Sequence, residues 1–274
     1  YNKVGKTGSN SFSDYLSCVL GSRVVHKLPI RYWDGSGEET KRWRQLVEPA
    51  LRRARGDQVP PLQIYAAHGP FINYSNVGVL PTYVNTARNP LTRLPSHFDQ
   101  WRGQLLTSDE KARGMTFTDA LLGRTSKSGE LKRMARNLLH YFLPKEDENR
   151  FDLLDDDTER TREAIRNMES EYLLVVPLED FDVGVQLLAC LFPPIQHALQ
   201  GTKCAIEKHN SKKESRNGSI SGEALRALEK LAHDTGEAAM YRASVSKFCA
   251  AWRYARANQC PFIANRSIPS TCTA

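Results

Sequence analysis

The sequence lacks the patterns that identify several common classes of protein. It has no C-x-x-C pair, which is the spacing that a zinc site or a redox centre would need. It has no run of roughly 18 apolar residues, as a membrane-spanning helix requires, and no signal peptide with charged, apolar and small-residue regions. We therefore expect neither a metal centre nor a membrane span within these residues.

The chain opens at Tyr1 without an initiator methionine, in what we expect to be the first core strand. We therefore expect that an upstream segment has been removed, together with any targeting information in it. The 274 residues carry a formal net charge of +7. This charge favours polyanionic partners such as nucleic acid, phosphorylated nucleotides, anionic glycans or anionic lipid surfaces, and it does not choose among them.

The cysteines and asparagines favour a secretory compartment, where disulfides persist and N-glycosylation occurs. The number of cysteines is even, at six. Three Asn-x-Ser sequons begin at Asn73, Asn217 and Asn265. We expect a disulfide between Cys260 and Cys272, which lie in the loop-rich C-terminal part, and we expect Cys190, inside an apolar helical pattern, to be a buried thiol.

Short β-rich runs alternate with helical patterns along the chain. The runs are Tyr1 to Val4, Arg23 to Leu28, Leu62 to Ala66, Thr82 to Ala87 and Tyr172 to Val176. This alternation predicts an α/β fold with a parallel sheet flanked by helices. The length suits one domain, spanning residues 1–274.

Apolar spacing predicts three main helical segments. One helix follows Ser9, and another runs from Phe181 to Phe192 and ends before Pro193, since proline cannot continue a helix. A long helical pattern extends from Glu223 to about Ala257, with Gly236 as the expected break between two helices.

A glycine-containing turn joins the first predicted strand to the first predicted helix, in the segment YNKVGKTGSNSF at residues 1–12. Free backbone N–H groups at the start of a helix after such a turn bind anions. The triphosphate-binding loop of kinases and ATPases requires GxxxxGK[ST], and this segment lacks the second glycine at that distance. A kinase interpretation therefore loses most of its support.

A second strand leads into a helix between Tyr83 and Phe98. Arg88 ends the strand, and Pro90 suits the first position of the helix. We expect Ser96 to come within reach of the same anion as Arg88, because a guanidinium fork and a hydroxyl together suit a phosphate.

These two segments, in this order, resemble the motifs of PAPS-dependent carbohydrate sulfotransferases, closest to the heparan sulfate and uronyl 2-O-sulfotransferases (PAPS is 3′-phosphoadenosine 5′-phosphosulfate). YNKVGKTGSNSF is similar to the family's 5′-phosphosulfate loop, and ARNPLTRLPSHF is similar to its 3′-phosphate motif R-D-P-x-x-R-x-x-S. IYAAHGPFINY resembles the segment with the catalytic histidine, and EYLLVVPLEDFDVGVQLLACLFP resembles a later strand and helix with an acidic pair. The resemblance implies a sulfotransferase or nucleoside-kinase-like fold with a P-loop-like turn.

The resemblance also implies roles for individual residues. His68 would be the general base, since a neutral imidazole with an ordinary pKa of about 6.5 suits the removal of a hydroxyl proton. Lys6 would stabilise the charge that develops on the bridging oxygen, and Lys3 and Arg216 would contact the acceptor. The residues implied to bind PAPS are Lys6, Thr7, Gly8, Ser9, Asn10, Ser11, Arg88, Ser96, Lys212 and Lys213. No metal is implied.

The implied acceptor is an anionic polysaccharide, modified at the 2-O position of a uronic acid. The alternatives are another anionic glycan such as a galactan, a catalytically silent glycan-binding relative, or a small-molecule kinase. Nucleic acid is not an expected partner, because the basic residues are dispersed and no nucleic-acid-binding motif is present. The resemblance further implies a Golgi-lumen domain held by an N-terminal anchor outside these residues, and a homo-oligomer is compatible with it.

The sequence departs from the family pattern at two places. Asn89 stands where the motif has aspartate, and the paired-cysteine loop of the 2-O-enzymes is absent between the 3′-phosphate motif and the later strand. The region from Arg102 to Glu163 is therefore poorly matched, and it leaves the acceptor sugar open.

Overall fold

The computed structural model describes residues 9–21, 24–27, 37–54, 64–66, 71–72, 74, 81–143, 157–201, 204, 220 and 222–273. In this part the chain is mixed α/β and mostly helical. Strands β1 (Val25–Lys27) and β2 (Ile64–Ala66) form one parallel pair, and β3 (Tyr83–Ala87) and β4 (Tyr172–Pro177) form another. Parallel pairing is confirmed, as are four of the predicted β-runs; the first, Tyr1 to Val4, lies outside the described residues.

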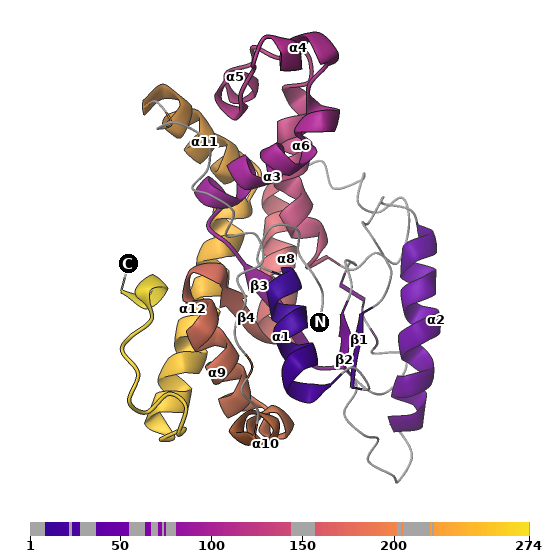
Figure 1. Ribbon diagram of the computed structural model, residues 1–274, viewed down its shortest axis with the longest axis vertical. Helices are drawn as coiled ribbons and strands as arrows, with labels where there is room; N and C mark the ends of the chain where they lie inside the picture. The colour runs from indigo at the N-terminus through magenta and orange to yellow at the C-terminus, as the bar shows by residue number, and fades with distance from the viewer. Residues whose placement is uncertain are drawn as a thin grey trace.

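Helices surround both strand pairs (Figure 1). The first half contains α1 (Ser9–Leu20), α2 (Gly37–Ala54), α3 (Pro90–Leu105), α4 (Ser108–Ala112), α5 (Phe117–Leu121) and α6 (Gly129–His140). The second half contains α8 (Asp157–Glu171), α9 (Phe181–Leu191), α10 (Pro193–Gly201), α11 (Gly222–Asp234), α12 (Glu237–Ala257) and the 3-10 turns η2 (Leu178–Asp180) and η3 (Ser270–Cys272). Helices α3 to α6 and α11 gather at the top of the view, and α9 and α10 lie at the bottom.

The predicted break at Gly236 is confirmed, and its cause is conformational. Gly236 has a φ of 73°, in the left-handed region that favours glycine, and a Cβ there would come within 1.7 Å of the Thr161 hydroxyl. The helix from Phe181 ends at Leu191, one residue before the predicted end, and α10 begins at Pro193 itself. Proline is tolerated in the first turn of a helix, where its missing N–H would have had no partner.

The β3–β4 pair lies at the centre of the core. Tyr83 and Tyr172 face each other across the pair with their rings 5.2 Å apart, and Phe142 packs against Tyr172. On α9, a Cβ at Gly184 would come within 2.0 Å of Val176, so glycine lets this helix lie directly against β4. Both faces of the pair are covered, as is usual for parallel strands.

All six cysteines are paired in disulfides, and two expectations from the sequence are wrong. The bonds are Cys18–Cys204, Cys190–Cys260 and Cys249–Cys272. Cys260 does not pair with Cys272, because η3 returns to α12 and brings Cys272 to Cys249, whereas Cys260 follows α12 and lies beside α9. Cys190 is therefore bonded to Cys260 and is not a free thiol. Disulfides as such are confirmed, and they are typical of oxidising compartments.

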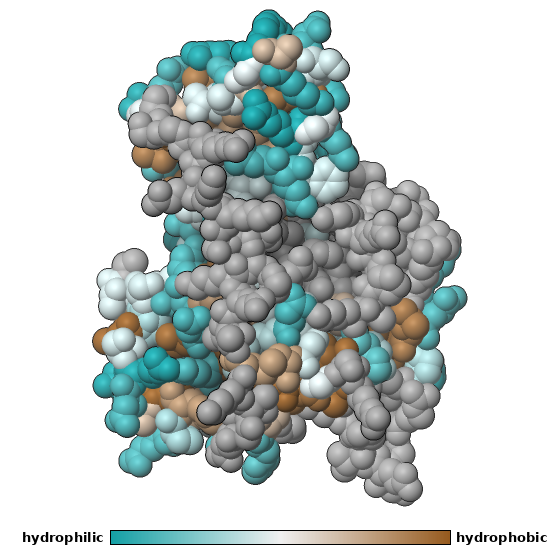
Figure 2. All heavy atoms as spheres, in the orientation of Figure 1, coloured by the Kyte–Doolittle hydropathy of each residue, from teal (hydrophilic) through white to brown (hydrophobic). Residues whose placement is uncertain are grey.

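The described surface is largely polar. Figure 2 shows that the lobe formed by α4, α5 and the adjoining helices is mainly hydrophilic on the face in view. Large exposed apolar side chains in the described residues are Leu46, Leu225, Tyr254 and Ile268. None of the described helices combines the length and the apolar composition needed to cross a lipid bilayer.

Candidate functional site

The candidate site lies at the carboxyl ends of β3 and β4. These strands are parallel, and Ala87 is opposite Pro177 in the register, so the residues that follow them emerge at one edge. Arg88 comes directly after β3, and Glu179 lies in η2 directly after β4. In open α/β sheets, ligands bind outside the edge formed by the carboxyl ends of the strands, so this edge is the candidate binding site.

Glu179 holds three elements together at this edge. Its Oε1 accepts a hydrogen bond from the backbone N–H of Asn89 at 2.9 Å, and its Oε2 accepts one from the Tyr241 hydroxyl at 3.1 Å. Burial lowers the pKa of Arg88, and the Glu179 carboxylate opposes that shift. The carboxylate thus joins β4, the start of α3 and α12, and it helps keep a partly buried guanidinium charged.

Arg88, Thr92 and Ser96 form a polar row along α3. The Arg88 Nε donates to the Thr92 hydroxyl at 3.1 Å, and Thr92 and Ser96 are one turn apart on the same helix face. Ser96 is half-buried, and its hydroxyl makes no hydrogen bond to any residue that the structure describes. The sequence prediction did not include Thr92, although its position four residues from both Arg88 and Ser96 was a usable signal.

Asn89, the departure from the family motif, caps helix α3. Its Oδ1 accepts from the backbone N–H of Leu91 at 2.9 Å, and Pro90 occupies the first turn as predicted. Asparagine and aspartate are about equally good N-caps. The substitution therefore keeps the local structure and places no second carboxylate beside Arg88.

Helix α1, which follows the segment predicted to be a glycine-containing turn, lies near the same edge of β3 and β4. Helix α1 begins at Ser9 as predicted, and the Ser11 and Phe12 side chains are buried. The ring of Phe12 packs edge-to-face against Phe181 at 5.9 Å, and Phe181 follows η2, which contains Glu179. The start of α1 and the Arg88 row, far apart in the sequence, are thus linked through residues 179–181.

Several predicted site residues lie outside the described part of the chain. They are Lys3, Lys6, Thr7, Gly8, His68, Lys212, Lys213 and Arg216, together with the side chains of Ser9 and Asn10. In the sequence, His68 follows closely after β2, whose last residue is Ala66. Ala66 is buried in the same hydrophobic cluster as Phe12 and Phe181, so β2 ends in the same part of the core as the start of α1.

Asp180, the second member of the acidic pair, anchors the C-terminal segment. Its two carboxylate oxygens accept hydrogen bonds from the backbone and hydroxyl groups of Ser270 and Thr271. Burial would raise the pKa of Asp180, but these hydrogen bonds outweigh burial and lower it. The carboxylate therefore has a structural role.

The second arginine of the motif, Arg93, is buried and faces away from the polar row. Its Nε makes an ion pair with Glu237 at the start of α12, and its Nη1 lies 3.2 Å from His97 Nδ1. Arg93 Nη2 and Glu237 Oε2 are buried without a hydrogen-bond partner in the described structure. Burial raises the pKa of Glu237, and the guanidinium opposes this rise. The pair fixes α3 against α12 and so positions the Arg88 row.

Comparison with protein-family models finds no match for the chain, and comparison with curated proteins finds no relative. A function must therefore be assigned from the residues and geometry of the site. That geometry combines a charged guanidinium, two hydroxyls and the start of a helix at one sheet edge, which suits an elongated ligand with more than one anionic group.

Proposed function

We propose that the chain is a PAPS-dependent glycan O-sulfotransferase that modifies the 2-O position of a uronic acid in a glycosaminoglycan-like polysaccharide. The observation that carries the proposal is the link between the start of α1 and the Arg88 row at the ends of β3 and β4. Two predicted anion-binding motifs, one directly before α1 and one at Arg88, would match a donor that has a phosphosulfate at one end and a 3′-phosphate at the other. A ligand with a single anionic group would need only one of these two motifs.

The described residues fit the 3′-phosphate end of this donor. Arg88 is a partly buried cation, and a guanidinium can form two parallel hydrogen bonds to a phosphate. Ser96 offers a hydroxyl without a partner in the described structure, and Thr92 orients the guanidinium. The 5′-phosphosulfate would lie against residues Lys6 to Ser11, at the start of α1.

In the proposed reaction the acceptor hydroxyl oxygen attacks sulfur, and the bond between sulfur and the 5′-phosphate oxygen breaks. His68 takes the proton from the hydroxyl, which makes the oxygen a better nucleophile. Lys6 and the backbone N–H groups of the turn stabilise the negative charge that grows on the departing oxygen, more in the transition state than in the ground state. The products are a sulfated glycan and 3′-phosphoadenosine 5′-phosphate.

The remaining elements of the proposal follow from the resemblance and from the disulfides. We propose a single catalytic domain with a sulfotransferase fold and a P-loop-like turn, located in the Golgi lumen and anchored by a segment outside these residues. Disulfides are compatible with that compartment. A galactan acceptor, a silent glycan-binding protein and a small-molecule kinase are the alternatives that experiments on the donor and the acceptor must separate.

Arg88→Ala should weaken the binding of 3′-phosphoadenosine 5′-phosphate by roughly tenfold to a hundredfold, because a charge-assisted hydrogen bond contributes about 1.5–3 kcal/mol. Ser96→Ala, which breaks no hydrogen bond within the described protein, should weaken it by a few-fold. Isothermal titration calorimetry measures both. Arg253→Ala removes an exposed arginine of α12 and serves as the charge-matched control. Equal affinity of the wild type and the Arg88 variant would reject the proposed donor site.

His68→Ala should reduce the rate of sulfuryl transfer by roughly a hundredfold to ten-thousandfold, which is the usual effect of a general base. The measurement uses labelled PAPS with desulfated heparan, chondroitin, dermatan and galactan chains, followed by identification of the labelled position. The affinity for 3′-phosphoadenosine 5′-phosphate should stay unchanged, and His197→Ala, an exposed histidine on α10, is the control.

Transfer that survives in the His68 variant would exclude this histidine as the base. A wild type that binds heparin without transferring label would indicate a silent glycan-binding protein. Phosphotransfer from ATP with no response to PAPS would indicate a kinase.

A further inference from the structure

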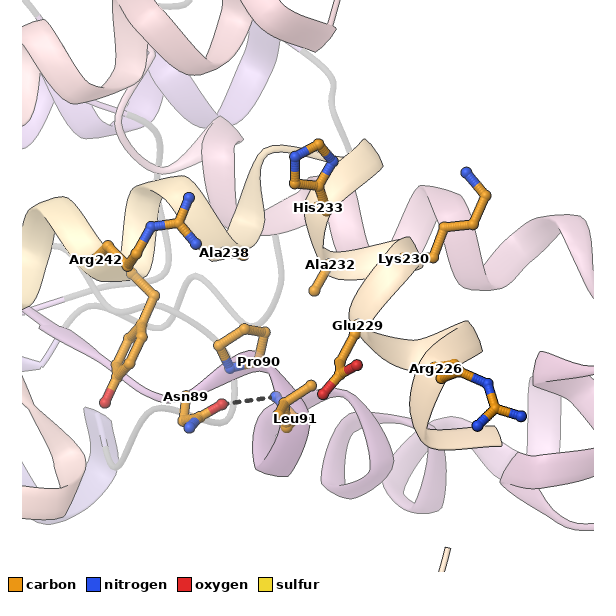
Figure 3. Close-up of a pocket in the computed structure, with 11 residues that line it drawn as sticks. Asn89, Pro90, Leu91, Arg226, Glu229, Lys230, Ala232, His233, Ala238 and Arg242 are labelled. Carbon is orange, nitrogen blue, oxygen red and sulfur yellow. Dashed lines mark hydrogen bonds between the residues drawn. The ribbon is translucent and has the colours of Figure 1, made fainter. Parts of the chain in front are cut away.

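An open groove lies between α11, α12 and the start of α3, apart from the polar row of α3. It has a volume of about 560 Å³. The lining residues are Asn89, Pro90, Leu91, Arg226, Glu229, Lys230, Ala232, His233, Ala238, Tyr241 and Arg242. Figure 3 shows Arg242 and Arg226 at opposite ends, with Glu229 near Leu91 between them.

The two arginines are the available cations of the groove. Arg226 and Arg242 are exposed, and neither makes an ion pair with a residue that the structure describes. Lys230, by contrast, donates to Asp234 at 2.7 Å, and this hydrogen bond lowers the pKa of Asp234. Lys230 also points away from Pro90 in Figure 3. Guanidinium groups at the two ends of the groove therefore attract a ligand with anionic groups, such as carboxylate or sulfate.

The middle of the groove has a different character. Pro90, Leu91, Ala232 and Ala238 provide small apolar contacts, and Glu229 is an exposed carboxylate without a partner in the described part of the chain. A carboxylate only accepts hydrogen bonds, so it binds hydroxyl groups and repels anionic groups. Repulsion at the centre of the groove disfavours a ligand with a negative charge at every unit, such as nucleic acid, and favours a hydroxyl group at this position.

We propose that this groove binds a sugar residue that carries a carboxylate or a sulfate. Arg226 and Arg242 bind the anionic groups, Glu229 accepts a hydrogen bond from a sugar hydroxyl, and the apolar residues contact the C–H face of the ring. A ligand that is both anionic and rich in hydroxyls satisfies all three kinds of group in the groove. The inference goes beyond the proposed transfer and does not rest on it, because glycan binding here needs neither the donor nor His68.

The first test is calorimetry with a heparin hexasaccharide in the absence of any nucleotide. The double variant Arg226→Ala/Arg242→Ala should bind this probe at least about tenfold more weakly than the wild type. The control is Arg253→Ala/Arg266→Ala, which loses the same charge from exposed sites outside the groove. If the control binds as weakly as the groove variant, the attraction is a property of net charge, and the proposal is wrong.

Two further measurements distinguish a sugar site from a nucleotide site and from a general attraction of anions. Arg226→Ala/Arg242→Ala should bind 3′-phosphoadenosine 5′-phosphate with wild-type affinity. A lower affinity for this nucleotide would show that the groove belongs to the donor site. Glu229→Gln should weaken the binding of the hexasaccharide a few-fold. It should strengthen the binding of inorganic tripolyphosphate, which has anionic groups and no sugar hydroxyls. Tighter binding of both probes by this variant would mean that Glu229 only repels anions, and would overturn the assignment of a sugar.

Discussion

Glu237→Ala should destabilise the folded protein by about 3–5 kcal/mol, because removal of one member of a buried ion pair leaves the other charge uncompensated. Arg93 and Glu237 are almost completely buried, and Arg93 Nη2 already lacks a partner in the described structure. Loss of the Glu237 carboxylate therefore leaves the Arg93 guanidinium buried without a counter-charge, in contact with His97 Nδ1. Chemical unfolding in urea, followed by circular dichroism, measures the change.

A double-mutant cycle separates the pair from a packing effect. Arg93→Met/Glu237→Leu removes both charges and restores apolar volume, so its loss of stability should be smaller than the sum of the losses of Arg93→Met and Glu237→Leu. If the change in unfolding free energy of the double variant equals the sum of the changes of the single variants, the two side chains do not interact. Exposed Glu223→Ala, on α11, should change stability by less than about 0.5 kcal/mol and serves as the control.

Cys18→Ser/Cys204→Ser should destabilise the protein by about 5 kcal/mol, and Cys249→Ser/Cys272→Ser by about 3 kcal/mol, in the chain-entropy description of disulfides. The difference arises because the first bond joins residues separated by 186 positions and the second joins residues separated by 23. A longer closed loop removes more conformations from the unfolded chain.

The same unfolding experiment tests this order, with both variants and the wild type kept under non-reducing conditions. Each variant has two intact disulfides, so the comparison is matched in the number of cross-links. Equal losses, or a larger loss for the Cys249 and Cys272 variant, would show that native contacts near the bonds outweigh the entropy of the unfolded chain.

Local signals in the sequence predicted the described strands and some of the helices, whereas α2, α4 to α6, α8 and α10 were not predicted. The start of α1 at Ser9 and the strands near Val25, Ile64, Tyr83 and Tyr172 follow from local patterns. The break at Gly236 also has a local signal, although the close approach of Thr161 adds to the need for glycine there. The disulfide partners were not predictable in this way. Cys249 lies beside Cys272 only because the chain after α12 returns along that helix. Hydrogen bonds from Ser270 and Thr271 to the Asp180 carboxylate hold this returning segment in place.

The candidate site was predictable in part, for the same reason. Arg88, Ser96 and the place of Pro90 in the first turn of α3 follow from a strand that leads into a helix, which is a local pattern. Glu179 and Arg93 gain their roles from partners far away in the sequence, at Asn89 and Glu237. A single sequence gives no measure of such distances, so the groove formed by α11, α12 and the start of α3 could not be foreseen.

The position of Tyr241 connects the two proposed binding regions, which would otherwise be independent. One part of this side chain lines the groove, while its hydroxyl is bound to the carboxylate that also holds the backbone next to Arg88. An occupant of the groove that displaces the tyrosine ring would release that carboxylate to interact with the guanidinium. Thermodynamic linkage then requires a donor at Arg88 to alter the affinity of the groove by the same factor.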